Sequence, residues 1–161
     1  SAALACGDPV IYMEHKELWG LVDDVTPEAR LPIGVARTLK TGSDITLVSW
    51  SRAVHAALEA ATLAAAEGIR VEVIDLRTLW PWDRDAVLAS AARTQRVLVV
   101  HEAVQVAGVG AEIAATVAET LGVRVKRLGG LRIPVGYAKP LEDEARFGAT
   151  EILQSIRAFV A

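Results

Sequence analysis

The chain has 161 residues, of which 52% are hydrophobic and 23% charged, so it can form one domain of ordinary size and is not a disordered polypeptide. Its net charge of −3 and its four lysines exclude the concentrated basic surface of a nucleic-acid-binding protein. The single cysteine excludes an internal disulfide, and no apolar stretch approaches the ~20 residues of a membrane span. We therefore expect a cytoplasmic protein with neither nucleic-acid nor membrane partners.

The first 38 residues differ in composition from the rest. Pro9–Met13 has the pattern of a short strand, and residues 20–40 hold two prolines, three acids and little periodicity, as a surface linker does. A lone strand followed by a linker predicts the end of a preceding domain over residues 1–38, with the main domain over 39–161. The chain does not begin with Met and shows no signal-peptide pattern, so we expect a piece of a longer protein. His15, which follows the lone strand, is expected to find its partners outside this chain.

A regular alternation of strands and helices follows this boundary. β-rich segments predict strands at residues 44–50, 71–76, 96–100 and 123–128. The predicted helices are one that Ser51 caps and Gly68 ends, one at 84–92, one at 110–121, and one that Thr150 caps and that runs to Phe159. Gly129–Gly130 is expected to end the fourth strand, with an irregular stretch after it. Such alternation predicts an α/β protein whose mainly parallel sheet is covered by helices on both faces.

His101 and Glu102 lie where the third predicted strand ends, at the edge where α/β proteins usually bind ligands. The pair is either a catalytic or contact site, or it hydrogen-bonds the following loop and fixes its shape. No second His or acid stands at a suitable spacing, which favours the structural role. Gly108 and Gly110 precede the next helix, but the loop is neither a P-loop nor a G-x-G-x-x-G motif, so no nucleotide site is expected. No residue is predicted to be catalytic or to bind a metal.

Two further segments carry candidate contact residues. Trp80 and Trp82 flank Pro81 after the second strand, either as core filling or as an exposed anchor for a subunit contact. The chain has few aromatic residues, which favours the contact. The acidic run at 142–144 is either a solvated loop or a surface that receives a basic partner.

Six segments occur together in an order that resembles a known family. They are VIYMEHK at 10–16, LPIG at 31–34, GSDITLVSW at 42–50, VEVIDLRTLWPWD at 71–83, VVHEA with GVGAEI between 99 and 113, and PVGYAKPLED at 134–143. Together they resemble the C-terminal part of the beta subunit of the thiamine-diphosphate-dependent component of 2-oxo-acid dehydrogenase complexes, of both the pyruvate and the branched-chain type. The resemblance covers nearly the whole chain.

The resemblance implies a three-layer α/β/α fold of the transketolase C-terminal type, with a five-stranded, mostly parallel sheet. In that family the complete enzyme is an oxidoreductase, an α2β2 heterotetramer that decarboxylates a 2-oxo acid and passes the acyl group to lipoamide. The diphosphate and Mg of thiamine diphosphate are held by the alpha subunit, and the activating carboxylate lies in the preceding domain of beta. This chain alone is therefore expected to bind no cofactor and to be inactive.

The implied role is assembly with the alpha subunit, a second beta subunit and the dihydrolipoyl acyltransferase core. Candidates for the subunit interface or for shaping its loop are Trp80, Trp82, His101, Glu102, Gly108 and Gly110. A basic docking domain on the acyltransferase favours acids at the rim of its contact, and the candidates are Glu119, Glu142, Asp143, Glu144 and the terminal carboxylate of Ala161.

One departure and two alternatives stand beside this interpretation. The family's loop after HEA is commonly Pro-Arg-x-Gly-Gly, whereas residues 104–108 read Val-Gln-Val-Ala-Gly, which puts any inherited role of that loop in doubt. A transketolase or deoxyxylulose-phosphate synthase domain would bind a sugar phosphate through a basic residue, for which Arg132 is the candidate. A stand-alone flavodoxin-like binding module is the other alternative, although such a module would not need the lone strand and linker.

Overall fold

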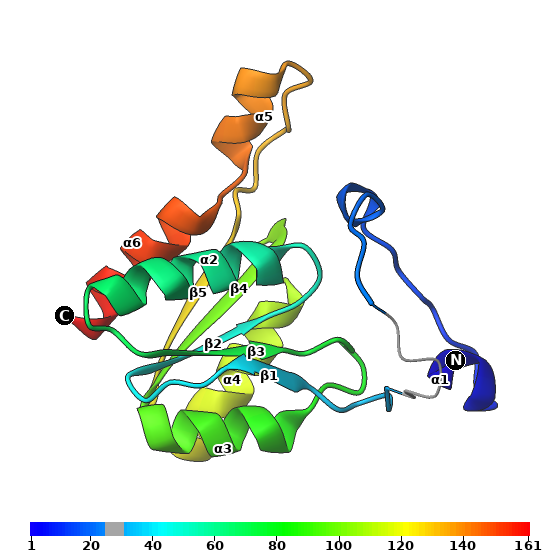
Figure 1. Ribbon diagram of the computed structural model, residues 1–161, viewed down its shortest axis with the longest axis horizontal. Coiled ribbons are helices and arrows are strands. Elements are labelled where there is room, and N and C mark those ends of the chain that lie inside the picture. Colours follow the sequence, from blue (N-terminus) through cyan, green and yellow to red (C-terminus); the bar gives the residue numbers. More distant parts are fainter. Residues whose placement is uncertain (25–30) are drawn as a thin grey trace.

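A five-stranded sheet forms the centre of the computed structural model, which describes residues 1–24 and 31–161 (Figure 1). The strands are β1 (Arg37–Lys40), β2 (Ile45–Ser49), β3 (Val71–Asp75), β4 (Arg96–Val104) and β5 (Arg124–Gly130). Their order in the sheet is β1-β3-β2-β4-β5. β1 runs antiparallel to β3, and all other neighbours pair in parallel. The predicted mostly parallel α/β fold is confirmed.

Helices cover both faces of this sheet, as Figure 1 shows. One face carries α2 (Ala53–Ala66) and α6 (Ala149–Val160), and the other carries α3 (Arg84–Thr94) and α4 (Val109–Leu121). The short helices are α1 (Ala2–Ala5), the 3-10 helix η1 (Lys16–Leu18) and α5 (Lys139–Ala145). None of the described helices is long and apolar enough to cross a membrane. Each face has its own hydrophobic core, so the sheet is buried on both sides.

The inner face of α2 consists of alanines. Ala57, Ala60, Ala61 and Ala64 are fully buried, at the i, i+3, i+4, i+7 spacing that places side chains on one side of a helix. Because these side chains are small, α2 packs closely on the sheet, and bulkier residues of α6 such as Ile156 complete the same core. The amino end of α2 is thereby held at the carboxyl edge of the sheet, where Glu102 of β4 also lies.

The first strand forms where the sequence predicted a linker. β1 pairs with β3, with Arg37 opposite Asp75. Conversely, the strand predicted at Pro9–Met13 is wrong, because that segment has no regular structure. A strand needs a neighbour for its backbone hydrogen bonds, and among the described residues this segment has none. The side chains of Ile11 and Tyr12 are correspondingly exposed.

The chain after β5 also differs from the prediction. The acids at 142–144 belong to α5 and not to a loop, and Pro140 lies in the first turn of that helix, where its missing N–H is not needed. The last helix begins two residues earlier than predicted. Gly148 is its N-cap, and the Glu151 carboxylate accepts a hydrogen bond from the Gly148 N–H at 2.8 Å, so Thr150 lies inside the helix.

Gly129 and Gly130 continue β5, where the sequence predicted its end. A Cβ at Gly130 would lie 2.7 Å from the Glu102 carbonyl oxygen, and one at Gly129 would lie 2.9 Å from the Gln105 Cα. The glycines therefore do not break the strand. They permit close approach of β4, which continues past Glu102 to Val104.

Residues 34–36 are clamped onto the loop that follows β3. The Gly34 N–H donates to Thr78 Oγ1 at 3.0 Å, and the Ala36 N–H donates to Asp83 Oδ2 at 2.8 Å. The Arg77 guanidinium donates to the Ala36 carbonyl oxygen at 3.3 Å. The LPIG and VEVIDLRTLWPWD segments, separate in sequence, thus form one structural unit that fixes the entry of the chain into the domain.

Asp83 is the residue on which this clamp can be tested. Its Oδ1 also accepts the Ala86 N–H at 3.0 Å and so caps α3. We expect Asp83→Ala to lower the free energy of unfolding by about 1–2 kcal/mol, measured by urea denaturation. Asp85→Ala is the matched control, because Asp85 lies in the same turn and makes no hydrogen bond among the described residues; its cost should stay below about 1 kcal/mol. Equal losses in the two variants would contradict the clamp.

Candidate functional site

His101 of β4 is fully buried at the carboxyl edge of the sheet. Its ring stacks on Trp50, with ring centroids 5.2 Å apart and planes at 13°. Neither ring nitrogen makes a hydrogen bond of ordinary geometry among the described residues, although the backbone of Ala103, in the last part of β4, lies near enough to act on the ring. Burial lowers the pKa of His101, which keeps the imidazole neutral at pH 7. The residue therefore acts here as a packed aromatic ring.

The loop before α4 closes over this ring because two of its residues lack side chains. A Cβ at Gly110 would lie 2.5 Å from His101 Cδ2 and Nε2, and one at Gly108 would lie 2.8 Å from His101 Cε1. Between β4 and these glycines, Ala107 has a φ of 58°, a left-handed conformation that favours glycine. The loop thus keeps a glycine-like backbone at Ala107, where the resembling family commonly has glycine.

Gly110→Ala tests the contact between loop and ring. The added methyl group meets a buried ring that has no room to move, so we expect a loss of about 1–3 kcal/mol in unfolding free energy, measured by urea denaturation. Gly20→Ala adds the same group in open space and should change stability by less than about 0.5 kcal/mol. An unchanged urea midpoint for Gly110→Ala would show that the loop does not lie on His101.

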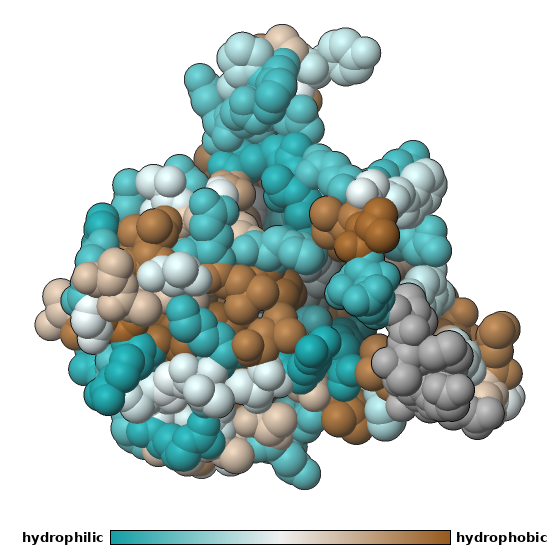
Figure 2. All heavy atoms as spheres, viewed as in Figure 1, coloured by the Kyte–Doolittle hydropathy of each residue, from teal (hydrophilic) through white to brown (hydrophobic). Residues whose placement is uncertain are grey.

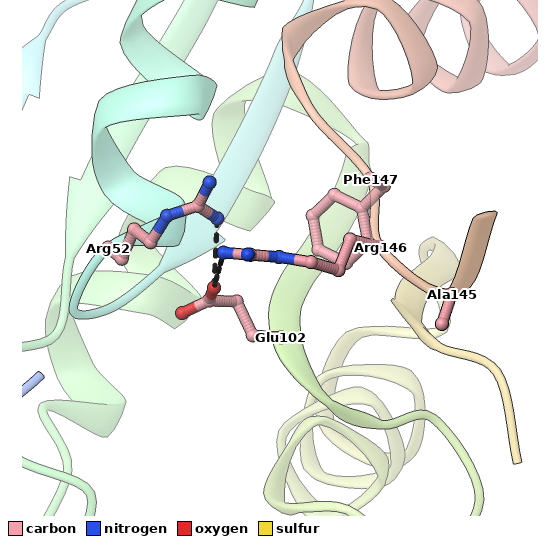
Figure 3. A pocket seen from close by; sticks show the side chains of 5 residues that line it. All are labelled: Arg52, Glu102, Ala145, Arg146 and Phe147. Carbon is pink, nitrogen blue, oxygen red and sulfur yellow. Dashed lines mark hydrogen bonds and ion pairs between the residues drawn. The ribbon is translucent and has the colours of Figure 1, made fainter. Parts of the chain in front are cut away.

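Glu102, the next residue of β4, lies in a group of charged side chains at the same edge. Its Oε1 accepts a hydrogen bond from Arg52 Nη1 at 2.9 Å, and its Oε2 lies 3.2 Å from His15 Nε2. Arg146 Nη2 lies 4.0 Å from the same carboxylate (Figure 3). We call His15, Glu17, Arg52, Glu102 and Arg146 the edge cluster.

Glu17 is the second carboxylate of the edge cluster. Arg146 Nη2 donates to both carboxylate oxygens of Glu17, to Oε1 at 2.7 Å and to Oε2 at 2.9 Å. The Oε2 atom of Glu17 also lies 2.5 Å from Arg52 Nε. The hydrogen bond from Arg146 holds the pKa of Glu17 below its usual range, and the same bond raises the pKa of Arg146. Arg146 Nη1 also donates to Glu142 of α5 at 3.2 Å. Each arginine therefore joins an acid of the N-terminal segment to an acid of the domain.

His15 has both ring nitrogens engaged within this chain. Its Nδ1 accepts the Glu17 N–H at 3.2 Å, so that nitrogen carries no proton, and the Nε2 proton faces Glu102. The expectation that the partners of His15 lie outside the chain is wrong. Since neither nitrogen is available to another molecule, His15 is held in place by the cluster and is not poised as a catalytic base.

The edge cluster borders a small cavity and a larger, open hollow of about 420 Å³; the hollow is lined by Glu17, Arg52, Lys139, Asp143, Arg146, Phe147, Gly148 and Glu151. The small cavity of about 30 Å³, enough for a water molecule, is lined by Arg52, Glu102, Ala145, Arg146 and Phe147 (Figure 3). In the described part of the chain, no group of three His, Cys, Asp or Glu side chains could hold a metal ion. The cluster carboxylates are held by arginine and histidine, so these residues do not fit a magnesium diphosphate. In this structure the contacts of the cluster are made with a segment of its own chain.

The pH dependence of the edge cluster follows from Glu17. Because its pKa is lowered in the folded chain, the Glu17–Arg146 bond stabilises the docked segment above the ordinary carboxyl range and is lost as pH falls through the lowered value. A carbon-13 NMR titration of the Glu17 carboxyl should therefore give a midpoint below about 4.3. Arg146→Gln should raise that midpoint, whereas Arg157→Gln, which removes a distant ion pair with Glu67, should not. A midpoint that Arg146→Gln leaves unchanged would contradict the assignment.

The two tryptophans around Pro81 have different environments. Trp82 is half-buried and packs against the core beneath α3 and α4. Trp80 is 85% exposed and covers none of that core. Core filling therefore accounts for Trp82, and Trp80 stays the candidate for a subunit contact.

The acids expected to dock an acyltransferase do not form a single patch. Glu142 and Asp143 lie on α5 and are paired with Arg146 and Lys139. Glu144 is exposed at the end of α5, Glu119 lies on α4, and Ala161 follows α6. Because α4 and α6 cover opposite faces of the sheet, only the acids of α5 lie together; Figure 2 shows the predominantly hydrophilic surface of that helix.

Three members of the edge cluster were not singled out from the sequence. Arg52 stands at the N-cap of α2, next to the predicted cap Ser51, whose φ of 56° and lack of a capping bond make that prediction wrong. Arg146 follows α5, and Glu17 lies in η1, 129 residues away in the chain. The only sequence signal is that each lies at the end of an element, and such a signal does not specify which charges will pair.

The fold is an α/β domain with a mostly parallel sheet, whose carboxyl edge is contacted by a segment of its own N-terminal part. Residues 34–152 match the family described as transketolase, C-terminal domain. This match covers most of the chain, which therefore belongs to the transketolase C-terminal domain family. The stand-alone flavodoxin-like alternative is thereby set aside.

Curated relatives extend the similarity over the N-terminal segment. The chain is 38% identical to the beta subunit of acetoin:2,6-dichlorophenolindophenol oxidoreductase of Cupriavidus necator, covering 96% of this chain and 47% of that one. It is 42% identical to the 2-oxoisovalerate dehydrogenase subunit beta of Chaetomium thermophilum, covering 83% of this chain and 30% of that subunit. It is 39% identical to the pyruvate dehydrogenase E1 component subunit beta of Pisum sativum, covering 88% of this chain and 42% of that subunit. The chain thus spans less than half the length of these relatives.

A solved structure described as a split gene transketolase, inactive beta4 tetramer, has the same fold. Its TM-score is 0.78 at 28% identity, over 88% of this chain and 47% of that chain. The antiparallel edge strand and the parallel strands therefore belong to an architecture known from experiment.

Proposed function

We propose that this chain is the C-terminal part of the beta subunit of a thiamine-diphosphate-dependent 2-oxo-acid dehydrogenase, and that it supports assembly of the enzyme. The observation that carries the proposal is the alignment of 96% of the chain with 47% of one beta subunit at 38% identity. Other beta subunits, named for pyruvate and 2-oxoisovalerate, align at similar identity. The part of the subunit that this chain lacks is the part in which we place the chemistry.

The same proposal divides the chain at residue 38. Residues 1–38 are the end of the preceding pyrimidine-binding domain with its linker, and residues 39–161 are the C-terminal domain. The exposed apolar side chains of Ile11, Tyr12 and Met13 support this division, because such side chains are usually covered by another part of a protein.

In the complete enzyme, thiamine diphosphate supplies the chemistry that decarboxylates the 2-oxo acid before acyl transfer to lipoamide. The alpha subunit and the preceding domain hold the cofactor and Mg. The residues of this chain contribute a rigid edge: Glu102 and Glu17 are held by arginines, and His101 is buried and neutral. They move no proton in the reaction.

The substrate is a 2-oxo acid in this proposal, and acetoin is the second candidate. The acetoin oxidoreductase subunit covers 96% of this chain, and the pyruvate dehydrogenase subunits of Pisum sativum and Arabidopsis thaliana cover 88% and 98%, so coverage does not separate these substrates. The identities, 38% to 42%, do not separate these substrates. A transketolase-like sugar phosphate is less well supported, because its one candidate residue, Arg132, is exposed in the irregular stretch after β5.

Two surfaces are proposed for the partners. Trp80 is placed in the contact with the alpha subunit or a second beta subunit, because a large, exposed indole is the kind of side chain that dominates interface energies. The acids of α5, with Glu119 and Ala161 as more distant candidates, are placed at the rim of the acyltransferase contact. The polar surface of α5 in Figure 2 suits a basic docking domain.

Association with the alpha subunit tests the function. In size-exclusion chromatography with light scattering, the chain mixed with the alpha subunit of the same enzyme should elute as a complex. Trp80→Ala should weaken that complex at least about tenfold, because truncating an interface tryptophan typically costs 2 kcal/mol or more. Leu63→Ala, which removes an exposed apolar side chain of α2, should leave it unchanged.

The complementary measurement is a calorimetric titration with thiamine diphosphate. The chain alone should give no binding heat, because the cofactor site lies in the alpha subunit and the preceding domain. Micromolar binding by the chain, or independent elution from the alpha subunit, would overturn the assembly role.

A further inference from the structure

We propose that Arg52, Glu102 and Arg146 form a docking surface for the turn at His15–Glu17, and that this surface fixes the orientation of the preceding domain on the C-terminal domain. The inference rests on the proposed function in one respect, the assignment of residues 1–38 to that preceding domain. The occupant is a segment of the same subunit and not a separate ligand.

Apolar burial does not account for the position of this turn. The large side chains on both sides of it are exposed: Ile11 is 87% exposed, Met13 74% and Trp19 67%. No residue of η1 is buried. The contacts that join the turn to the domain are those of the edge cluster, so these polar contacts determine where the turn lies.

The two sides of the contact are complementary in charge and hydrogen bonding. The domain presents two guanidinium groups around the carboxylate of Glu102, and the turn presents a carboxylate and an imidazole N–H. Glu17 accepts from Arg146 at 2.7 and 2.9 Å, in a geometry in which both carboxylate oxygens are used. The imidazole of the turn thus faces a carboxylate of the domain, and the carboxylate of the turn faces both of the domain's guanidinium groups.

The turn itself is rigid enough to transmit orientation. The Leu18 N–H donates to the His15 carbonyl oxygen at 2.9 Å, and the Glu17 N–H donates to His15 Nδ1 at 3.2 Å. The side chain of His15 thus supports the turn with one nitrogen and faces Glu102 with the other. Glu102 acts as a positioning residue for His15 and, through it, for the chain that leads back to the preceding domain.

Hydrogen exchange in the 161-residue chain measures the docked state directly. The amides of Leu18 and Trp19 should exchange roughly fivefold faster in Arg146→Gln and in Glu17→Gln, because these variants break contacts in an ion-pair network. The double variant should exchange no faster than the faster single variant, since the two side chains act on the same contact. Arg157→Gln, which breaks the distant pair with Glu67, is the matched control and should have no effect.

A distance measurement tests the orienting role. Spin labels at the native, exposed Cys6 and at Gln154→Cys on α6 should give a narrow distance distribution that broadens in Arg146→Gln and Glu102→Gln. A broad distribution in the labelled chain with an intact edge cluster, an unchanged distribution in the two charge variants, or exchange rates that respond equally to Arg157→Gln would each overturn the proposal. Because all these measurements are made on this chain alone, they are independent of whether it binds an alpha subunit.

Discussion

The position of β4, between β2 and the edge strand β5, is the constraint on which the rest of the site depends. Successive side chains of a strand point to opposite faces, so β4 delivers His101 into the core and Glu102 toward the surface. His101 fills the space between Trp50 and the loop before α4. The Glu102 carboxylate contacts charged side chains from three distant segments of the chain. A one-residue shift of β4 would exchange these roles and place an acid beside Trp50. The long pairing of β4 with β5 prevents that shift.

The sequence predicted the parts of the fold whose apolar patterns are long. β2, β3 and β4 are runs of buried residues, and the helices between them end at glycines or begin at caps, so the parallel α/β arrangement followed from local chemistry. β1 and α5 were missed because four and seven residues are too few to show a period. Gly129–Gly130 was misinterpreted because close backbone approach, unlike a turn, depends on the neighbouring strand.

The candidate site was predictable only in part, for a different reason. His101 and Glu102 were found because they follow an apolar strand, a local signal. The partners of Glu102 lie 50 residues away at Arg52 and more distant still at His15, and ion pairs leave no periodic trace in a sequence. His15 shows the consequence: its partner was expected in another chain, although it was already present at the end of β4. Charge pairs of this kind are specified by topology, which brings the ends of parallel strands and the starts of their helices to one edge.

The N-terminal segment is attached to the domain in two physically different ways. At residues 34–36, side chains of the β3–α3 loop bind backbone groups, and such bonds are directional and little affected by salt. At the turn around Glu17 the attachment is by partly exposed ion pairs, which weaken as salt screens them. The first therefore fixes where the chain enters the domain, and the second fixes the orientation of the segment through contacts that salt weakens. The charges of the edge cluster are thus paired within the chain itself, and the surfaces that we propose for recognition are those that contact other parts of a larger assembly.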